Sequence, residues 1–400
     1  MDSSRTPVIV SAVRTPIGRY LGGLAPLTAP QLGSAVIREA VHRAGVDTRT
    51  IDEVIIGNVL QGGVGQAPAR QAMLGAGIPA SVSAVTVNKV CGSGLKAVML
   101  AAQAIRAGDA QAIVAGGMES MSNAPHYVYG YRGGVKLGDQ SLVDGMIRDG
   151  LWCSSCNVHM GTHAEYTARK GDVTRERQDE FAAGSHRKAV AAQDQGKFRA
   201  EIVPVDVPSR KGLTVVDTDE GPRRETTPES LAALKPAFGA KGAANLTVTA
   251  GNASTLNDGA AAVVVTSAAF AKEHGLPVLA RITAYATGAV EPQELFFAPV
   301  RAVGALLARE GTAIGDYDLI EANEAFASQA LADGDALGWP WERVNVHGGA
   351  IALGHPIGAS GTRVLVTLLH AMADRGAARG LATLCLGGGD AVALGVVREA

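Results

Sequence analysis

The sequence predicts an α/β fold made of two similar halves and a large insertion. Segments with strand-like and helix-like apolar patterns alternate near both ends of the chain, which is typical of α/β proteins. Two distant stretches follow one plan, and the region between them breaks the pattern. With 400 residues the chain is too long for one ordinary core, so we expect two or three domains.

The first part of the chain alternates regularly between the two kinds of segment. Such alternation predicts strands joined by helical crossovers, and therefore a largely parallel, buried sheet. The helix that starts at residue 29 should end at Gly45, and the helix after Cys91 should end at Gly108. The expected strands are 8–13, 51–60, 82–90 and 110–117, and the expected helices are 29–45, 67–77 and the segment after Cys91.

The last third repeats this organisation. We expect a strand-to-helix unit at 319–332, a glycine-led helix at 358–376 and two strands around a glycine turn at 380–397. The stretches CGSGLKAVMLAAQAIRAGDAQAIVAGG and IGASGTRVLVTLLHAMADRGAARGLATLCLGGG both run from a glycine-serine start through a helix to a strand that ends in glycines. A duplicated half-domain accounts for this similarity.

The middle of the chain is richer in charge and tyrosine than either half. A helix is expected at 174–196, with Thr174 as its cap. We interpret this region as an inserted loop domain, because functional loops are commonly supported by a rigid scaffold. The predicted division is an N-terminal half at 1–119 and 249–270, a loop domain at 120–248 and a C-terminal half at 271–400.

Composition limits the classes of function. Hydrophobic residues make up 47% and charged residues 18%, and there are 50 glycines, a profile typical of a compact α/β enzyme. The net charge of −2 provides no overall basic surface, so we expect no nucleic-acid partner. We find no secretion signal and no apolar run long enough for a membrane span, so we expect a cytoplasmic protein without membrane contact.

The four cysteines, at 91, 153, 156 and 385, do not form the pattern of a disulfide framework. Cys153 and Cys156 form a CxxC pair, which occurs in zinc sites and in redox proteins. No second CxxC or HxxxH follows this pair, so we expect no metal site.

Cys91 lies in VNKVCGSGLKAV, between a segment rich in β-branched residues and a helical segment. At a helix start the first backbone N–H groups lack partners and the helix dipole is positive. Such a position favours the thiolate and can make a cysteine nucleophilic. The alternative is a small cysteine buried in a tight turn.

Three further glycine-rich segments carry polar or sulfur-containing residues. Asn323 in EANEAFA, His355 in ALGHPIGASG and Cys385 in LCLGGGD could each be structural, as a cap, a core histidine and a buried thiol. Together with Cys91, however, all of them follow or end apolar segments, and ligands of open α/β sheets bind at the carboxyl ends of strands. A cysteine, a histidine that takes its proton and a second cysteine make a set suited to acyl transfer.

These motifs resemble the thiolase family, and within it the short-chain acetyl-CoA C-acetyltransferases. The matching segments are NKVCGSGLKAV, GGMESMSNAPH, VTAGNASTLNDGAAA, EANEAFA, NVHGGAIALGHPIGASG and LCLGGG, and the resemblance covers nearly the whole chain. It implies two βαβαβαββ halves packed as a five-layered α/β/α/β/α sandwich, with a loop domain that binds coenzyme A. The implied reaction is the reversible Claisen condensation of two acetyl-CoA molecules to acetoacetyl-CoA and CoA, without a further cofactor.

The resemblance also implies catalytic roles. Cys91 would accept the acyl group, His355 would take its proton, and Cys385 would remove a proton from the methyl group of acetyl-CoA. Asn323 would hold a water that forms one oxyanion hole with His355, and the backbone N–H groups of Cys91 and Gly387 would form a second hole. Donors aimed at developing charge in this way typically contribute several kcal/mol.

Other residues are implied in binding and assembly. The segment from Asn123 to Gly138 resembles the loop through which family members form homotetramers, and Arg223 is the expected phosphate contact. The residues expected to bind the substrate are Leu151, His159, Met160, Arg223, Ser230, Ser254, Ala325 and Phe326.

Three departures from the family pattern bear on this interpretation. The segment LFFAP, 295–299, places two phenylalanines where small residues are usual and could narrow the acyl tunnel. Thr255 replaces a common glycine, and Asp390 follows the glycine turn, where it could raise the pKa of Cys385 or simply be solvated. The alternatives are a degradative thiolase for longer 3-ketoacyl-CoA, a decarboxylating condensing enzyme, a silent CoA-binding relative and, least favoured, a zinc or redox protein built on the CxxC pair.

Overall fold

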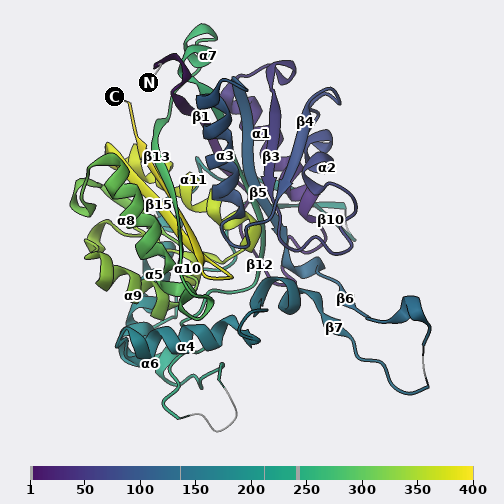
Figure 1. Cartoon of the computed structure of the whole chain (residues 1–400), viewed down its shortest axis with the longest axis vertical. Helices are drawn as coiled ribbons and strands as arrows, with labels where there is room; N and C mark the ends of the chain where they lie inside the picture. The colour runs from purple at the N-terminus through teal and green to yellow at the C-terminus, as the bar shows by residue number, and fades with distance from the viewer. Residues whose placement is uncertain (1–2, 136, 211, 240–243, 400) are drawn as a thin grey trace.

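The protein consists of two α/β halves with an inserted segment at one end of them (Figure 1). The computed structural model describes residues 3–135, 137–210, 212–239 and 244–399. In Figure 1 the first part of the N-terminal half is purple to blue, the insertion is teal, and the C-terminal half is green to yellow. Residues 257–273 complete the N-terminal half and are therefore teal to green. Among the described helices, none combines the length and the apolar composition that crossing a bilayer requires.

The N-terminal half follows the predicted βαβαβαββ order. Glycines in the left-handed conformation end two of its helices, with φ of 69° at Gly45 and 89° at Gly108. Its elements are β1 (Pro7–Arg14), β2 (Gly18–Arg19), α1 (Ala29–Ala44), β3 (Glu53–Gly57), α2 (Pro68–Gly75), β4 (Ser83–Val87), α3 (Ser93–Ala107), β5 (Ala112–Ser120), β12 (Asn257–Ser267) and α7 (Ala268–Glu273).

The C-terminal half repeats this order, except that one strand is replaced by a single β-bridge. Where the N-terminal half has β4, the C-terminal half has an isolated parallel bridge between Ile320 and Val344. Its elements are β13 (Ala280–Ala289), α8 (Ala298–Glu310), β14 (Leu319–Ala322), α9 (Ala327–Leu337), α10 (Ala350–Leu353), α11 (Ile357–Arg375), β15 (Arg379–Leu386) and β16 (Asp390–Val397).

The prediction of a largely parallel sheet is wrong. In the described part of the chain, the parallel pairs of the main sheet are β3–β4, β3–β5 and β14–β15, and its other pairs are antiparallel. The last strand of each half, β12 or β16, runs back alongside the strand that precedes it in that half, β5 or β15. Two strands that run in opposite directions in this way pair antiparallel. Hydrogen bonds between β1 and β13 join the two halves, so that the strand order is β14-β15-β16-β13-β1-β12-β5-β3-β4, with β2 on β12.

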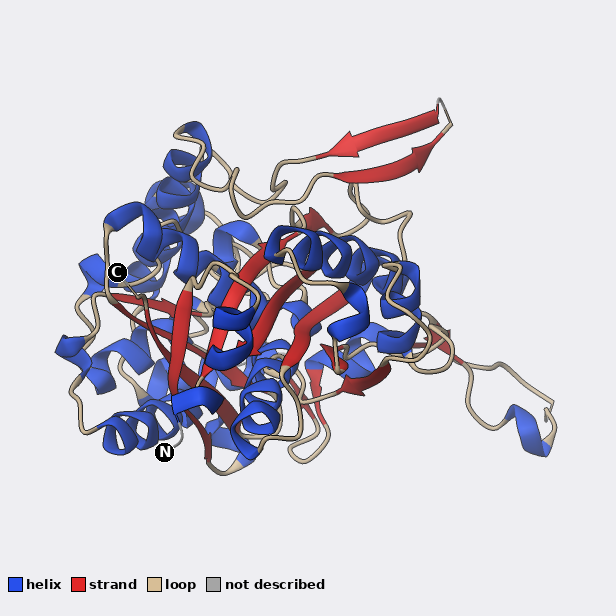
Figure 2. Cartoon of the chain, turned by 90° about the horizontal axis from the view of Figure 1, so that it is seen from above, coloured by secondary structure: helices blue, strands red, loops and turns tan. Residues whose placement is uncertain are grey.

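Five layers result, as the family resemblance implied. The outer face of the N-terminal strands packs on α1 and α2, and the outer face of the C-terminal strands packs on α8. Both inner faces pack on α3 and α11, which share one buried cluster with strands of both halves. The view from above shows helices on both sides of the strands (Figure 2).

The insertion lies across one end of this sandwich. Within it, α4 packs against α9, and α5 packs against both α6 and α10. A long arm, residues 126–135 and 137–144, projects from the body and is closed at its base by β6 and β7 (Figures 1 and 2). The elements of the insertion are β6 (His126–Tyr127), β7 (Val143–Asp144), β8 (Trp152–Cys153), β9 (Val158–His159), α4 (Met160–Lys170), α5 (Arg175–Asp194), β10 (Val205–Ser209), β11 (Gly212–Val216) and α6 (Pro228–Ala232).

The two central helices touch at their first turns through glycine. A Cβ atom on Gly361 would lie 2.4 Å from the backbone nitrogen of Leu95, and a Cβ atom on Gly94 would lie 2.8 Å from the backbone nitrogen of Thr362. These distances are below van der Waals contact, so only glycine permits the observed approach of α3 and α11.

We therefore expect Gly361→Ala to destabilise the protein. The added methyl must displace the backbone of α3, and overpacking of this kind costs about 1–3 kcal/mol. Urea-induced unfolding followed by circular dichroism measures the change. Gly304→Ala is the matched control, because Gly304 lies in α8 with nothing within 4 Å of an added Cβ, and the better helix propensity of alanine should stabilise α8 by up to about 1 kcal/mol. Equal effects of the two substitutions would contradict the close approach.

Candidate active site

A cavity of about 520 Å³ opens between the two halves and the insertion. Its wall is mostly apolar, and the side chains of Cys91, His355 and Cys385 line it together with Gly387. Cys91 comes from the N-terminal half, whereas the other three residues come from the C-terminal half. The cavity therefore brings together four of the five residues to which the sequence assigned catalytic roles.

Cys91 lies between the end of β4 and the start of α3, as predicted. The preceding residue, Val90, has a φ of 45°, a left-handed conformation that is strained for a β-branched residue. Side chains hold this turn in place, because Asn88 Oδ1 accepts the Val90 N–H at 3.0 Å and Ser93 Oγ accepts the Lys89 N–H at 2.8 Å. The strained turn directs the cysteine toward the cavity.

The expectation that the helix start favours a thiolate at Cys91 is wrong. Burial raises the pKa of the Cys91 thiol to about 12, although hydrogen bonds from the backbone N–H groups of Gly387 and of Cys91 itself act in the opposite direction. Loss of solvation therefore outweighs the local dipoles. The same geometry places two N–H donors beside the sulfur, where the second oxyanion hole was expected.

His355 is a neutral base directly before α11. Burial, reinforced by the positive charge of Arg363, lowers the pKa of His355 to about 3. Its Nδ1 lies 2.6 Å from Ser360 Oγ, and Ser360 Oγ donates its only proton to the carbonyl of Pro356 at 2.9 Å. Ser360 must then accept a proton from Nδ1, so Nε2 is unprotonated and can take the proton of Cys91.

Asn323 lies behind His355, outside the cavity lining. Its backbone N–H donates to the carbonyl of Thr383 at 3.0 Å, which extends the pairing of β14 with β15, and its Nδ2 lies 3.5 Å from both ring nitrogens of His355. Asn323 Oδ1 is buried and has no partner among the described residues. The expected water between Asn323 and the substrate stays a prediction.

Cys385 is buried at the end of β15, and the pKa of its thiol is well above the usual value. Burial is the main cause, followed by the charges of Cys91 and Asp333. The hypothesis that Asp390 raises this pKa is wrong, because Asp390 forms an ion pair with Lys89 instead. That ion pair connects the turn before Cys91 with the glycine turn between β15 and β16.

Most of the residues expected to bind the substrate line the same cavity, and Ser230 does not. The hydroxyl of Ser230 closes a capping box with Thr227 at the start of α6, and the neighbouring Leu231 lines the cavity instead. The predicted binding residues in the lining are Leu151, His159, Met160, Arg223, Ser254, Ala325 and Phe326.

Sequence reasoning missed two further features of the wall. Arg19 joins Arg223 in the lining and adds a second positive charge, and Phe238 stacks on His159 with ring centroids 5.1 Å apart. Arg19 lies in RTPIGRYLGGL, so the motif could have indicated it. No periodicity or motif around Phe238 distinguishes it from a core residue.

The LFFAP segment affects the cavity through only two of its bulky residues. Leu295 and Phe296 line the cavity and share a buried cluster with Cys385. The ring of Phe296 packs edge-on against Phe326, with centroids 5.3 Å apart. Phe297 instead packs against a different cluster, which includes Val173.

The fold and the site together define a cysteine-dependent acyl-transfer centre between two related α/β halves. Residues 7–269 match the family described as "Thiolase, N-terminal domain", and residues 276–398 match "Thiolase, C-terminal domain". The chain belongs to the thiolase family.

Individual relatives are similar over nearly their whole length. An acetyl-CoA acetyltransferase of Pseudomonas aeruginosa is 58% identical over 98% of this chain and 99% of its own. One from Cupriavidus necator is 57% identical over the same shares. The crystal structure of the Bacillus anthracis acetyl-CoA acetyltransferase matches with a TM-score of 0.96 and 41% identity, covering 100% of both chains.

Replacing Ser360 by alanine should slow acylation of Cys91. Without the Ser360 acceptor, Nδ1–H loses its partner and the imidazole is free to adopt the other tautomer, which cannot act as the base. We expect acyl-enzyme formation to fall by about 10- to 100-fold. Rapid quenching with radiolabelled acetyl-CoA measures this rate. Circular dichroism provides the control for folding, and an unchanged acylation rate would exclude a role of Ser360 in selecting the tautomer.

Proposed function

We propose that this protein is an acetyl-CoA C-acetyltransferase, which condenses two acetyl-CoA molecules to acetoacetyl-CoA and CoA and catalyses the reverse thiolysis. The observation that carries the proposal is the convergence of Cys91, His355 and Cys385 on one cavity in a chain more than half identical to acetyl-CoA acetyltransferases. Acetyl-CoA, acetoacetyl-CoA and CoA are the substrates and products, and the chemistry requires no cofactor.

The first half-reaction forms a thioester on Cys91. His355 Nε2 takes the thiol proton while the sulfur attacks the acetyl carbonyl, and the N–H groups of Cys91 and Gly387 stabilise the oxyanion. The departing CoA thiolate takes a proton from Cys385. The site then holds acetyl-Cys91, a protonated His355 and a Cys385 thiolate.

The second half-reaction uses these charges. The Cys385 thiolate removes a proton from the methyl group of a second acetyl-CoA. The protonated His355 and a water held by Asn323 stabilise the enolate oxygen. The enolate carbon attacks the acetyl group, Cys91 departs as a thiolate, and His355 returns its proton. Both thiols are neutral again, which agrees with the raised pKa of each in the resting protein.

A degradative thiolase for longer 3-ketoacyl-CoA is the second candidate. The apolar wall supports it, because that wall could accommodate an alkyl chain. The aromatic pair Phe296 and Phe326 beside Cys385 favours a short-chain acetyl-CoA C-acetyltransferase, because the two rings occupy the space that a longer acyl chain would need.

Assembly as a homotetramer in the cytoplasm also belongs to this proposal. The arm supports self-association, because exposed apolar side chains lie along the described parts of both its branches. The four free cysteines fit a reducing compartment. The exposed apolar residues of the arm are Val128, Tyr129, Tyr131, Val135, Leu137 and Leu142.

Replacement of Cys91 and replacement of Cys385 should impair different steps of the reaction. Cys91→Ala should abolish acyl-enzyme formation, because no nucleophile remains. Cys385→Ala should still be acylated, because His355 serves Cys91 directly, but condensation should fall by about 10²- to 10⁴-fold with loss of the base. Mass spectrometry of the protein after exposure to acetyl-CoA, together with steady-state condensation assays, distinguishes the two. Normal condensation by Cys385→Ala would refute the assignment of the base.

Phe296→Ala should change the preferred chain length. Removing the ring opens space beside Cys385, and we expect the ratio of kcat/KM for a C8 3-ketoacyl-CoA to that for acetoacetyl-CoA to rise by about tenfold or more. Thiolysis assays with both substrates measure the ratio. Phe297→Ala is the matched control, because that ring lies outside the cavity, and a wild-type preference for the C8 substrate would support the degradative candidate.

A further inference from the structure

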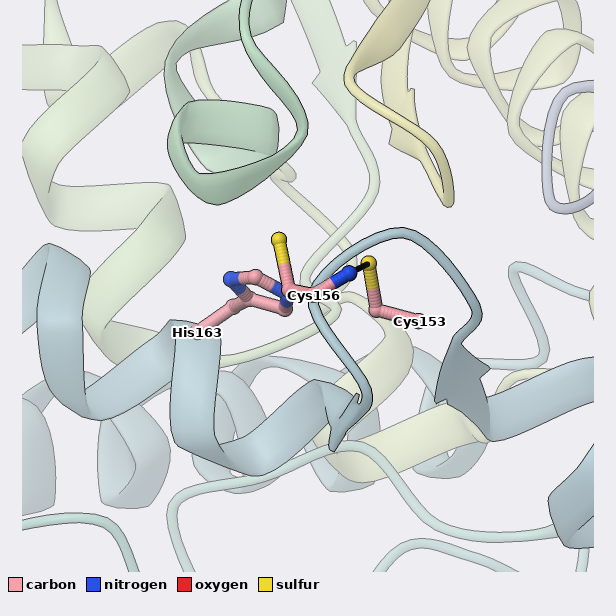
Figure 3. Close-up of side chains that lie close together, drawn as sticks. All are labelled: Cys153, Cys156 and His163. Atoms are coloured by element: carbon pink, nitrogen blue, oxygen red, sulfur yellow. Dashed lines mark hydrogen bonds between the residues drawn. The ribbon is translucent and has the colours of Figure 1, made fainter.

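The CxxC pair lies in a small hairpin beside the cavity, formed by β8 and β9. Cys153 ends β8, Cys156 lies in the turn, and His163 projects from the first turns of α4 (Figure 3). One donor atom from each of these three side chains lies within 4.8 Å of the others. The sequence prediction missed this grouping because it searched for a second CxxC or an HxxxH pair, and His163 follows Cys156 by seven positions.

The turn has the features of a metal-binding knuckle. The backbone N–H of Cys156 donates to Cys153 Sγ at 3.3 Å, the dashed contact in Figure 3. Asn157 follows with a φ of 54°, so the chain reverses directly after the second cysteine. A backbone N–H aimed at the sulfur stabilises a thiolate there, and the reversal keeps both sulfur atoms on one side of the turn.

The side chain of His163 has a buried nitrogen that is available to a metal ion. The residue is only 2% exposed, and its Nε2 has no hydrogen-bond partner among the described residues. Its ring hydrogen-bonds to the backbone carbonyl of Gln293. Metal-binding histidines commonly donate one ring N–H to a carbonyl and turn the other nitrogen to the ion, whereas a buried nitrogen without a partner is otherwise unfavourable.

We propose that Cys153, Cys156 and His163 bind a zinc ion. Two thiolates and a neutral imidazole cancel the charge of Zn²⁺, which suits a largely buried position, and the two thiol protons pass to solvent on binding. Sulfur and imidazole donors select zinc over magnesium or calcium, which prefer oxygen ligands. The described residues offer no fourth donor of these kinds in the cluster, so water completes a tetrahedral site.

The zinc site would support the wall of the coenzyme A cavity. His159 and Met160 lie between Cys156 and His163 in the chain, and both line the cavity. Binding one ion from the hairpin and from α4 restricts the segment that connects them. The role is structural, so the proposal goes beyond the transferase reaction and does not depend on it.

Metal analysis of the purified full-length protein tests the proposal. After expression in zinc-supplemented medium and purification without chelators or metal-affinity resin, we expect about one zinc per chain by plasma mass spectrometry. Cys156→Ser and His163→Gln should each lower this to less than about one tenth. Ser155→Ala is the matched control in the same turn and should retain zinc. Cys91→Ser should also retain it, which shows that zinc is not held by the catalytic thiols.

Cobalt substitution provides a measurement that needs no variant. Protein stripped with a chelator and reloaded with Co²⁺ should show thiolate-to-cobalt charge transfer and the visible bands of a tetrahedral site. Absence of these bands, or of zinc in the wild-type protein, would overturn the proposal. So would a thiol titration that finds Cys153 and Cys156 joined as a disulfide. None of these readouts measures catalysis, so failure of the zinc site and failure of the transferase assignment remain distinguishable.

Discussion

The close approach of α3 and α11 is the constraint on which the active site depends. Cys91 immediately precedes the first of these helices and His355 precedes the second, so the contact at Gly94 and Gly361 brings nucleophile and base to the same end of the central layer. The inner faces of both halves bury this helix pair. The relative position of Cys91 and His355 is therefore set by the core, and a preorganised site of this kind avoids reorganisation during the reaction.

Burial gives this site its electrostatic character. In the resting protein both thiols are neutral and His355 is a neutral base, because removal from water disfavours the charged form of each group. Charge then arises only when an acyl group is transferred. In the proposed mechanism the proton of Cys91 moves to His355, the proton of Cys385 leaves with CoA, and the resulting pair of opposite charges promotes the condensation. A resting Cys91 thiolate would not need His355 as a base, and Ser360 would then have no reason to select its tautomer.

Much of the fold could be predicted from local signals, whereas the properties of the site required tertiary information. Apolar periodicity and terminal glycines such as Gly45 and Gly108 located the helices, and the repeat identified two halves. Strand direction was wrong because periodicity does not reveal which strands become neighbours. The pKa of Cys91 was predicted in the wrong direction for a related reason. The dipole of α3 can be inferred locally, but the burial that outweighs it arises only in the folded chain. The capping box of Ser230 on α6 was not foreseen either, and the contact of Ser230 with the substrate stays a prediction.

The same distinction separates Cys153 and Cys156 from the catalytic cysteines. All four cysteines are free and none lies on a highly exposed surface, so burial alone does not assign their roles. What differs is the partner that the fold supplies. Cys91 and Cys385 share a cavity with a histidine whose Nδ1 is engaged by Ser360, which leaves Nε2 directed to proton transfer. Cys153 and Cys156 lie beside His163 of α4, whose buried Nε2 has no partner among the described residues. None of these three residues lines the cavity. The arrangement around His355 suits proton transfer, whereas the arrangement around His163 suits a bound metal ion.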